Sequence, residues 1–172
     1  MELSIIFLPL IASIISGFFG KYIGDRNSEI VTSALVSISA LLSIFVLYQV
    51  IVNQYEENIV IATWINSGSL DVNWSMLIDP LSAVMLVVVT SVSSLVHIYS
   101  IGYMSHDPHK PRFMAYLSLF TFAMLMLVTS DNFVQLFFGW EGVGLCSYLL
   151  IGFWYKKESA NNAAIKAFIV NR

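Results

Sequence analysis

The chain has 172 residues, of which 58% are hydrophobic and only 11% are charged, and its mean hydropathy is +0.78. A soluble domain of this length needs a polar surface that such a composition does not supply. The composition therefore excludes an ordinary soluble protein, and the net charge of −3 says little about partners.

Five apolar runs are long enough to cross a hydrocarbon core of about 30 Å, which takes roughly 17–25 helical residues. In chain order they cover residues 3–19, 30–52, 80–104, 113–130 and 133–155. The first run begins beside the acidic Glu2 and precedes no small-residue cleavage pattern, so we expect a retained helix and not a signal peptide. The pattern predicts an all-α membrane protein with about five transmembrane helices and the start of a sixth.

Local chemistry marks several helix ends. Asp79 followed by Pro80 is typical of a helix start, and residues 130–132 offer caps for the fifth span. Residues 159–162 are expected to cap the sixth apolar stretch, which runs on to Arg172. Because that stretch is too short to be a finished span, we expect the chain to be an N-terminal fragment of a longer protein.

The longest connection, residues 53–75, alternates apolar and polar side chains around residues 66–69. Alternation with a turn signal predicts a short hairpin, here lying on the membrane surface between the second and third helices. Trp64 and Trp74 suit the membrane interface.

Basic residues occupy every other connection, and the intervening connections contain acidic residues but no lysine or arginine. The basic set is Lys21, Arg26, Lys110, Arg112, Lys156, Lys157 and Lys166. The positive-inside rule then places the basic connections in the cytoplasm or matrix and the N-terminus outside.

Glu141 is the most informative residue, because it lies within the apolar run of residues 133–155. An acidic group near the centre of a membrane helix costs roughly 2.5–3.5 kcal/mol by insertion measurements, so its presence indicates a function. At 1.5 Å per residue it lies about 12 Å beyond Phe133. Gly139, Gly142 and Gly144 remove bulk around it and favour close approach of another helix. We expect an intramembrane proton relay; the alternative is a structural, hydrogen-bonded acid.

The third span has a polar face, formed by Thr90, Ser94 and His97 at helical spacing. His97 is a candidate polar-path residue, since imidazole titrates near neutrality, although a histidine satisfied by hydroxyl groups fits equally well. His106 and His109 lie in a proline-containing loop that supplies too few ligands for a metal site. The sequence indicates neither a metal site nor a cofactor-binding site, and it contains no motif for nucleic-acid binding.

Three segments of the chain are specific enough to indicate a family: FFGWEGVGLCSYLLIGFWY, supported by DPLSAVMLVVVTSVSSLVHIYSIGYM and KAFIVNR. Through these segments, and over essentially all of its residues, the chain resembles subunit L of proton-pumping NADH:quinone oxidoreductase, the NADH dehydrogenase subunit 5 type of respiratory complex I. The resemblance implies an antiporter-like helical bundle that moves protons within the complex. In the family the glutamate matching Glu141 pairs with a lysine on a later helix, which is absent here.

The resemblance also implies a division of the chain and a set of partners. Residues 1–112 would form the first three transmembrane helices with the outside loop 53–75, and residues 113–172 would begin the proton-translocating module. The partners would be the lipid bilayer and other membrane-arm subunits, which hold NADH, flavin, iron–sulfur clusters and quinone. The membrane would be the bacterial cytoplasmic or mitochondrial inner membrane, and this fragment alone is expected to be inactive. A sodium/proton antiporter subunit and an inactive membrane scaffold are the alternatives.

Overall fold

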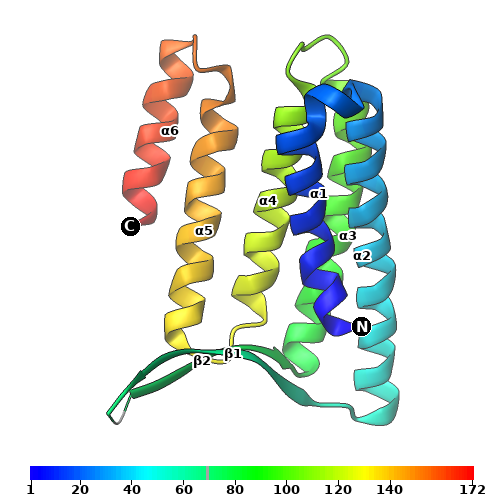
Figure 1. Ribbon diagram of the computed structural model, residues 1–172, viewed down its shortest axis with the longest axis vertical. Helices are drawn as coiled ribbons and strands as arrows, with labels where there is room; N and C mark the ends of the chain where they lie inside the picture. Colours follow the sequence, from blue (N-terminus) through cyan, green and yellow to red (C-terminus); the bar gives the residue numbers. More distant parts are fainter. Residues whose placement is uncertain (69) are drawn as a thin grey trace.

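The computed structural model describes every residue of the chain except Ser69. Its elements, in order, are α1 (Glu2–Ile23), α2 (Asp25–Asn53), β1 (Glu57–Ser67), β2 (Leu70–Ile78), α3 (Pro80–Tyr103), α4 (Lys110–Val128), α5 (Phe133–Ile151), the 3₁₀ turn η1 (Gly152–Trp154) and α6 (Glu158–Asn171). Helices α1 to α4 pack together, α5 lies against α4, and α6 lies against α5 (Figure 1).

Five helices are long and apolar enough to cross a membrane, which confirms the predicted number of spans. They run up and down so that the α1–α2, α3–α4 and α5–α6 connections meet at one end, with the hairpin at the other (Figure 1). Most of the basic residues lie at the first of these ends, for example Lys21 in the last turn of α1 and Lys110 at the start of α4. We call this the basic end. Lys166 and Arg172 are exceptions, within and just after α6.

The outer surface of the bundle is apolar, whereas many hydroxyl groups lie inside it. Leu41, Leu81 and Leu95 are each about two-thirds exposed or more, while Thr32, Ser39 and Ser118 are fully buried. Apolar side chains on the outside are compatible with a membrane interior, and hydroxyl groups inside can bond between helices. This inverted arrangement is the one that a membrane-spanning bundle requires.

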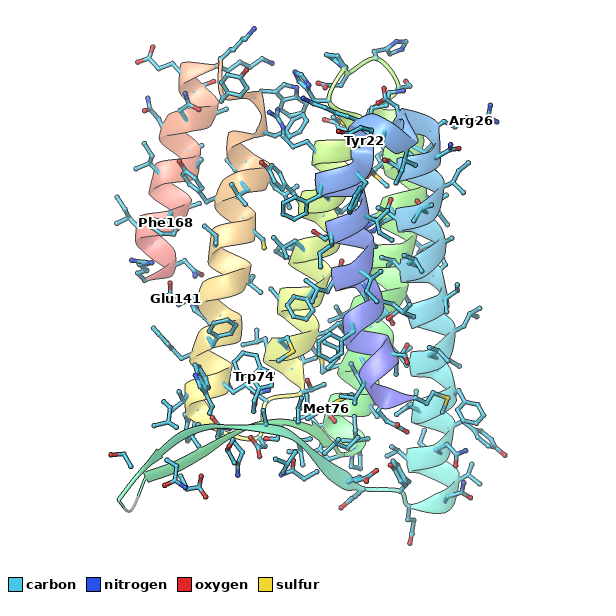
Figure 2. The ribbon with its side chains drawn as sticks, viewed as in Figure 1. Tyr22, Arg26, Trp74, Met76, Glu141 and Phe168 are labelled. Carbon is cyan, nitrogen blue, oxygen red and sulfur yellow. The ribbon has the colours of Figure 1, made fainter. Side chains whose placement is uncertain are left out.

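The predicted hairpin is present and is longer than expected, because β2 extends to Ile78. The two strands are antiparallel, and Gly68 at the turn has φ 62°, a conformation that glycine adopts without steric cost; Ser69 lies outside the described residues. Met76, at the hairpin end of the bundle (Figure 2), and Ile78 are both fully buried. They join a cluster that also contains Ile5, Ile6, Val46, Val50, Ala83, Leu86, Leu125 and Met126.

Aromatic rings attach the middle of the hairpin to α5. Trp64 and Trp74 meet edge to face with centroids 4.9 Å apart, and Phe138 packs against both rings. The tryptophans predicted for the interface are therefore packed side chains at the hairpin end of the bundle.

Polar contacts fix the hairpin to the α4–α5 connection. The backbone N–H of Leu77 donates to the carbonyl of Thr129 at 2.8 Å. Asn58 donates through its amide to Asp131 at 3.0 Å. Burial alone would raise the pKa of Asp131, but side-chain hydrogen bonds, including those from Asn58 and Asn132, hold it below the usual value for an aspartate. The carboxylate therefore stays ionised and binds the hairpin.

Two of the predicted helix starts are confirmed. The Asp79 side chain caps α3 by accepting from the Ser82 N–H at 2.7 Å. The Ser82 hydroxyl oxygen in turn accepts from the Asp79 N–H, which completes a capping box. Asn132 caps α5. The expectation that residues 159–162 cap the last helix is wrong: α6 begins at Glu158, with Lys157 at the cap position and no side-chain cap bond. Glu158 suits a first helical turn, where the helix dipole favours an acidic group.

Candidate functional site

Glu141 lies near the middle of α5 and forms an ion pair with the last residue of the chain (Figure 2). Its Oε2 is 3.1 Å from the Nε of Arg172. The Glu141 side chain is 25% exposed and the Arg172 side chain 60%. An ion pair of this length between apolar helices is a charge-assisted hydrogen bond. The carboxyl group predicted to be functional is therefore held by a cation and half-buried in protein.

Contacts between α5 and α6 position the arginine. The Trp140 indole donates to the carbonyl of Asn171 at 3.1 Å. The Arg172 guanidinium lies 4.4 Å from the centre of the Phe168 ring, a cation–π distance. The charged pair is thus bracketed by contacts on both helices.

The glycines near Glu141 do bring other helices close, as the sequence predicted. A Cβ built on Gly139 would lie 2.8 Å from Cα of Leu127 in α4, and one on Gly142 would lie 3.3 Å from Cβ of Ala123. Gly144 faces α6 instead, where the side chain of Asn171 fills the space. The lack of a side chain at these glycines therefore allows α5 to lie close to both α4 and α6.

Hydroxyl groups and His97 form a polar seam through α2, α3 and α4. On the α2 side, Ser43 bonds to Thr90 at 2.8 Å and Ser37 to Ser94 at 2.7 Å. On the α4 side the seam consists of Ser93, His97, Ser118 and Thr121. Here Ser93 bonds to Thr121 at 2.5 Å. The polar face predicted for the third span thus makes contacts on both of its sides.

His97 is fully buried within the seam. Its Nδ1 is 2.7 Å from the carbonyl oxygen of Ser93, and its Nε2 is 3.0 Å from Oγ of Ser118. Because a carbonyl oxygen only accepts, we assign a proton to Nδ1; in the neutral ring Nε2 then accepts from the serine hydroxyl. This network satisfies a neutral imidazole.

Comparison with known proteins shows which family the chain is related to. Residues 64–114 match the family described as NADH-ubiquinone oxidoreductase (complex I), chain 5 N-terminus. Residues 130–172 match the NADH:quinone oxidoreductase/Mrp antiporter transmembrane family. NADH-ubiquinone oxidoreductase chain 5 of Arabidopsis thaliana is 57% identical over 172 residues, 100% of this chain. NADH-quinone oxidoreductase subunit L of Rickettsia conorii is 55% identical over 168 residues, 98% of this chain. The chain belongs to the chain 5/subunit L family.

The chain spans about a quarter of the length of these curated relatives, 26% in each case. A solved structure, the membrane-bound sulfane sulfur reductase, an archaeal respiratory membrane complex, has a chain with the same fold. The TM-score is 0.78 at 18% identity, covering 98% of this chain and 34% of that one. At this identity the likeness concerns the fold alone.

Two charged residues of this family member escaped the sequence reasoning. Arg172 ends the KAFIVNR segment, and no periodicity within α5 tells which later residue faces Glu141. Glu29 was also missed: its side chain is 6% exposed and lies 3.9 Å from Nζ of Lys110. A signal was available, since Glu29 lies at helical spacing from the buried Thr32 and Ser33.

Proposed function

We propose that the chain forms part of a proton-translocating membrane-arm subunit of NADH:quinone oxidoreductase, with Glu141 as its intramembrane proton carrier. The observation that carries this proposal is the pairing of Glu141, near the middle of the apolar α5, with Arg172 at the end of α6, in a chain of the chain 5/subunit L family. Ionisable groups at such depth are costly and usually belong to a proton or ion pathway.

The ion pair of Glu141 and Arg172 would act as a switch, because the distance of the cation decides whether the carboxyl group holds a proton. A carboxylate beside a guanidinium stays ionised, whereas the same group in an apolar site without the cation takes up a proton. Displacement of Arg172, or of α6 as a whole, would load Glu141 with a proton, and return of the cation would release it. Movement driven elsewhere in the complex is thereby coupled to proton transfer at one carboxyl group.

His97 is proposed as a polar-path residue that connects hydroxyl groups of α3 and α4. The chain would hold no redox group of its own, and NADH, flavin, iron–sulfur clusters and quinone would reside on partner subunits. We place the subunit in the bacterial cytoplasmic or mitochondrial inner membrane with its N-terminus outside, and we retain the division into residues 1–112 and 113–172.

The experiment is Glu141→Gln in the full-length protein assembled with its partners, with proton pumping and quinone reduction measured on the same preparation. Loss of a positioned proton carrier should lower pumping by about a hundredfold. Glu141→Asp should be milder, because the charge survives at a shorter reach. Glu56→Gln, at an exposed site before the hairpin, is the matched control. Unchanged pumping and unchanged quinone reduction in Glu141→Gln would refute the proposal.

A sodium/proton antiporter is the second candidate, because the family matched by residues 130–172 also includes Mrp antiporters. Proteoliposomes containing the full-length protein assembled with its partners distinguish the two. Sodium-dependent proton movement without NADH would favour the antiporter, whereas movement that requires NADH and quinone would favour the oxidoreductase subunit. Normal assembly with neither activity would favour an inactive scaffold.

A further inference from the structure

Arg112 lies in the first turn of α4 at the basic end, where it contacts the turn that follows α5. Its Nη2 donates to the carbonyl oxygen of Phe153 at 3.2 Å. The guanidinium carbon is 4.6 Å from the centre of the Phe153 ring and 5.6 Å from that of Tyr155. Backbone and aromatic contacts therefore orient the side chain, but they supply no negative charge.

Most of the hydrogen-bonding capacity of Arg112 is unused. A guanidinium has five N–H donors, and within the described residues only Nη2 has an acceptor. The Nε atom is buried without a hydrogen-bond partner. No carboxylate among the described residues lies within 4.0 Å of the guanidinium. Arg112 is partly buried, and removing a cation from water without a counter-charge is costly, so the site suits an anion.

Arg112 faces a cavity of about 460 Å³ between α4, α5 and α6. Its polar walls consist of Tyr116, Tyr148, Tyr155 and Asn161, all of which can donate hydrogen bonds. Its remaining lining residues, Leu149, Gly152, Phe153, Ala164 and Ile165, include no acidic residue. The cavity lining thus combines one cation with neutral hydrogen-bond donors and apolar side chains.

A second, smaller cavity of about 240 Å³ continues from Arg112 toward the end of the bundle. Lys156 and Lys157 line it, with Asp107 as the acidic residue of the lining. Asp107 already accepts a hydrogen bond from the Trp154 indole at 3.1 Å. Three cations, Arg112, Lys156 and Lys157, therefore line this cavity against one carboxylate.

We propose that Arg112 and these two cavities bind a phosphate group, that of an anionic phospholipid headgroup. The planar guanidinium matches phosphate oxygens in a bidentate arrangement. Basic pockets between helix ends are suited to lipid headgroups. The lysines attract the headgroup, Arg112 and the tyrosines bind the phosphate, and Leu149 and Ile165 contact the start of an acyl chain.

The test compares the melting temperature of the full-length protein in detergent with added phosphatidylglycerol or phosphatidylcholine. Specific binding should raise the melting temperature by about 5 °C more with phosphatidylglycerol. Arg112→Gln should abolish this increment. Arg26→Gln, which removes an exposed cation from the same end (Figure 2), should retain it. An increment that persists in Arg112→Gln would overturn the proposal.

Two further measurements complete the test. Inorganic phosphate at millimolar concentration distinguishes the source: an Arg112-dependent increment with phosphate alone would support the same chemistry with a soluble anion, and none would support the lipid. If Arg112→Gln does not fold, the double variant Lys156→Gln/Lys157→Gln replaces it. That variant should weaken lipid binding about tenfold, and an unchanged response would count against the site.

Discussion

The Nε of Arg172 lies 3.1 Å from Oε2 of Glu141, although the two residues belong to different helices and are 31 positions apart in sequence. This contact gives the intramembrane carboxyl group a cation that its own helix does not provide. The relationship between these two side chains is the basis of the first prediction.

Removing the cation should disturb proton transfer without removing the carboxyl group. We expect Arg172→Gln to lower proton pumping by about tenfold, the effect of losing one charge-assisted hydrogen bond of about 1.5 kcal/mol. Arg172→Lys should retain more of the rate, because the charge remains while the planar donor geometry is lost. Pumping per assembled complex is the measurement, with Lys166→Gln on the same helix as the control. Equal rates in Arg172→Gln and the wild type would show that the pair has no role.

Adding a methyl group at Gly139 should force α5 away from α4. The new Cβ would lie 2.8 Å from the Leu127 backbone, and overpacking of this kind costs typically about 1–3 kcal/mol. Gly102→Ala is the matched control, since nothing lies within 4 Å of its Cβ position, and it should be neutral or slightly stabilising. Thermal unfolding of the two variants provides the comparison. Equal melting temperatures would contradict the close α4–α5 packing.

Substitutions of His97 separate hydrogen bonding from proton carriage. His97→Leu should leave the Ser118 hydroxyl without its partner, at about 1–3 kcal/mol, while the Ser93 carbonyl keeps its place in the backbone hydrogen bonding of α3. His97→Gln can replace both bonds and should keep most of the stability and pumping rate. Folded yield and pumping are measured in parallel. A normal yield of His97→Gln with a hundredfold loss of pumping would instead identify a titrating proton carrier.

Gln135 should prove essential for docking of the hairpin. It is fully buried; its Oε1 accepts from the Ser75 N–H at 2.9 Å and its Nε2 donates to the Ser75 carbonyl at 2.6 Å. Gln135→Ala leaves the Ser75 N–H and carbonyl without these hydrogen-bond partners, which costs about 1–3 kcal/mol of stability for each group. Hydrogen exchange of β2 should accelerate accordingly. Gln49→Ala, which loses only an exposed contact with Asn53, should leave exchange unchanged, and the same result for Gln135→Ala would sink the prediction.

Hydropathy, caps and alternation were sufficient to predict the helices and the hairpin from the sequence. Lipid selects long apolar runs directly, and the Asp79 cap acts through residues three positions apart. Glu141 was recognisable for the same reason, since one acid in an apolar run is conspicuous without any knowledge of its neighbours.

Contacts between distant segments could not be predicted in this way. The bond between Gln135 and Ser75 spans 60 positions, and nothing in either local sequence specifies the other. Arg172 as the partner of Glu141 depends on how α6 packs on α5, which small residues such as Gly144 permit but do not determine. The missed burial of Glu29 depends likewise on α4, which brings Lys110 beside it.

The polar seam has a mechanical consequence. Hydroxyl pairs at successive heights on α3, Thr90 with Ser43 and Ser94 with Ser37, admit one axial alignment of α2 and α3, and a slip of either helix would break both. Along the described lengths of α4 and α5, by contrast, no side-chain hydrogen bond joins the two helices, which touch through Gly139 and Gly142. Hydrogen bonds therefore hold α2 and α3 in one register, whereas α5 keeps its place beside α4 by packing over these glycines, and the hairpin holds its first turn through Gln135.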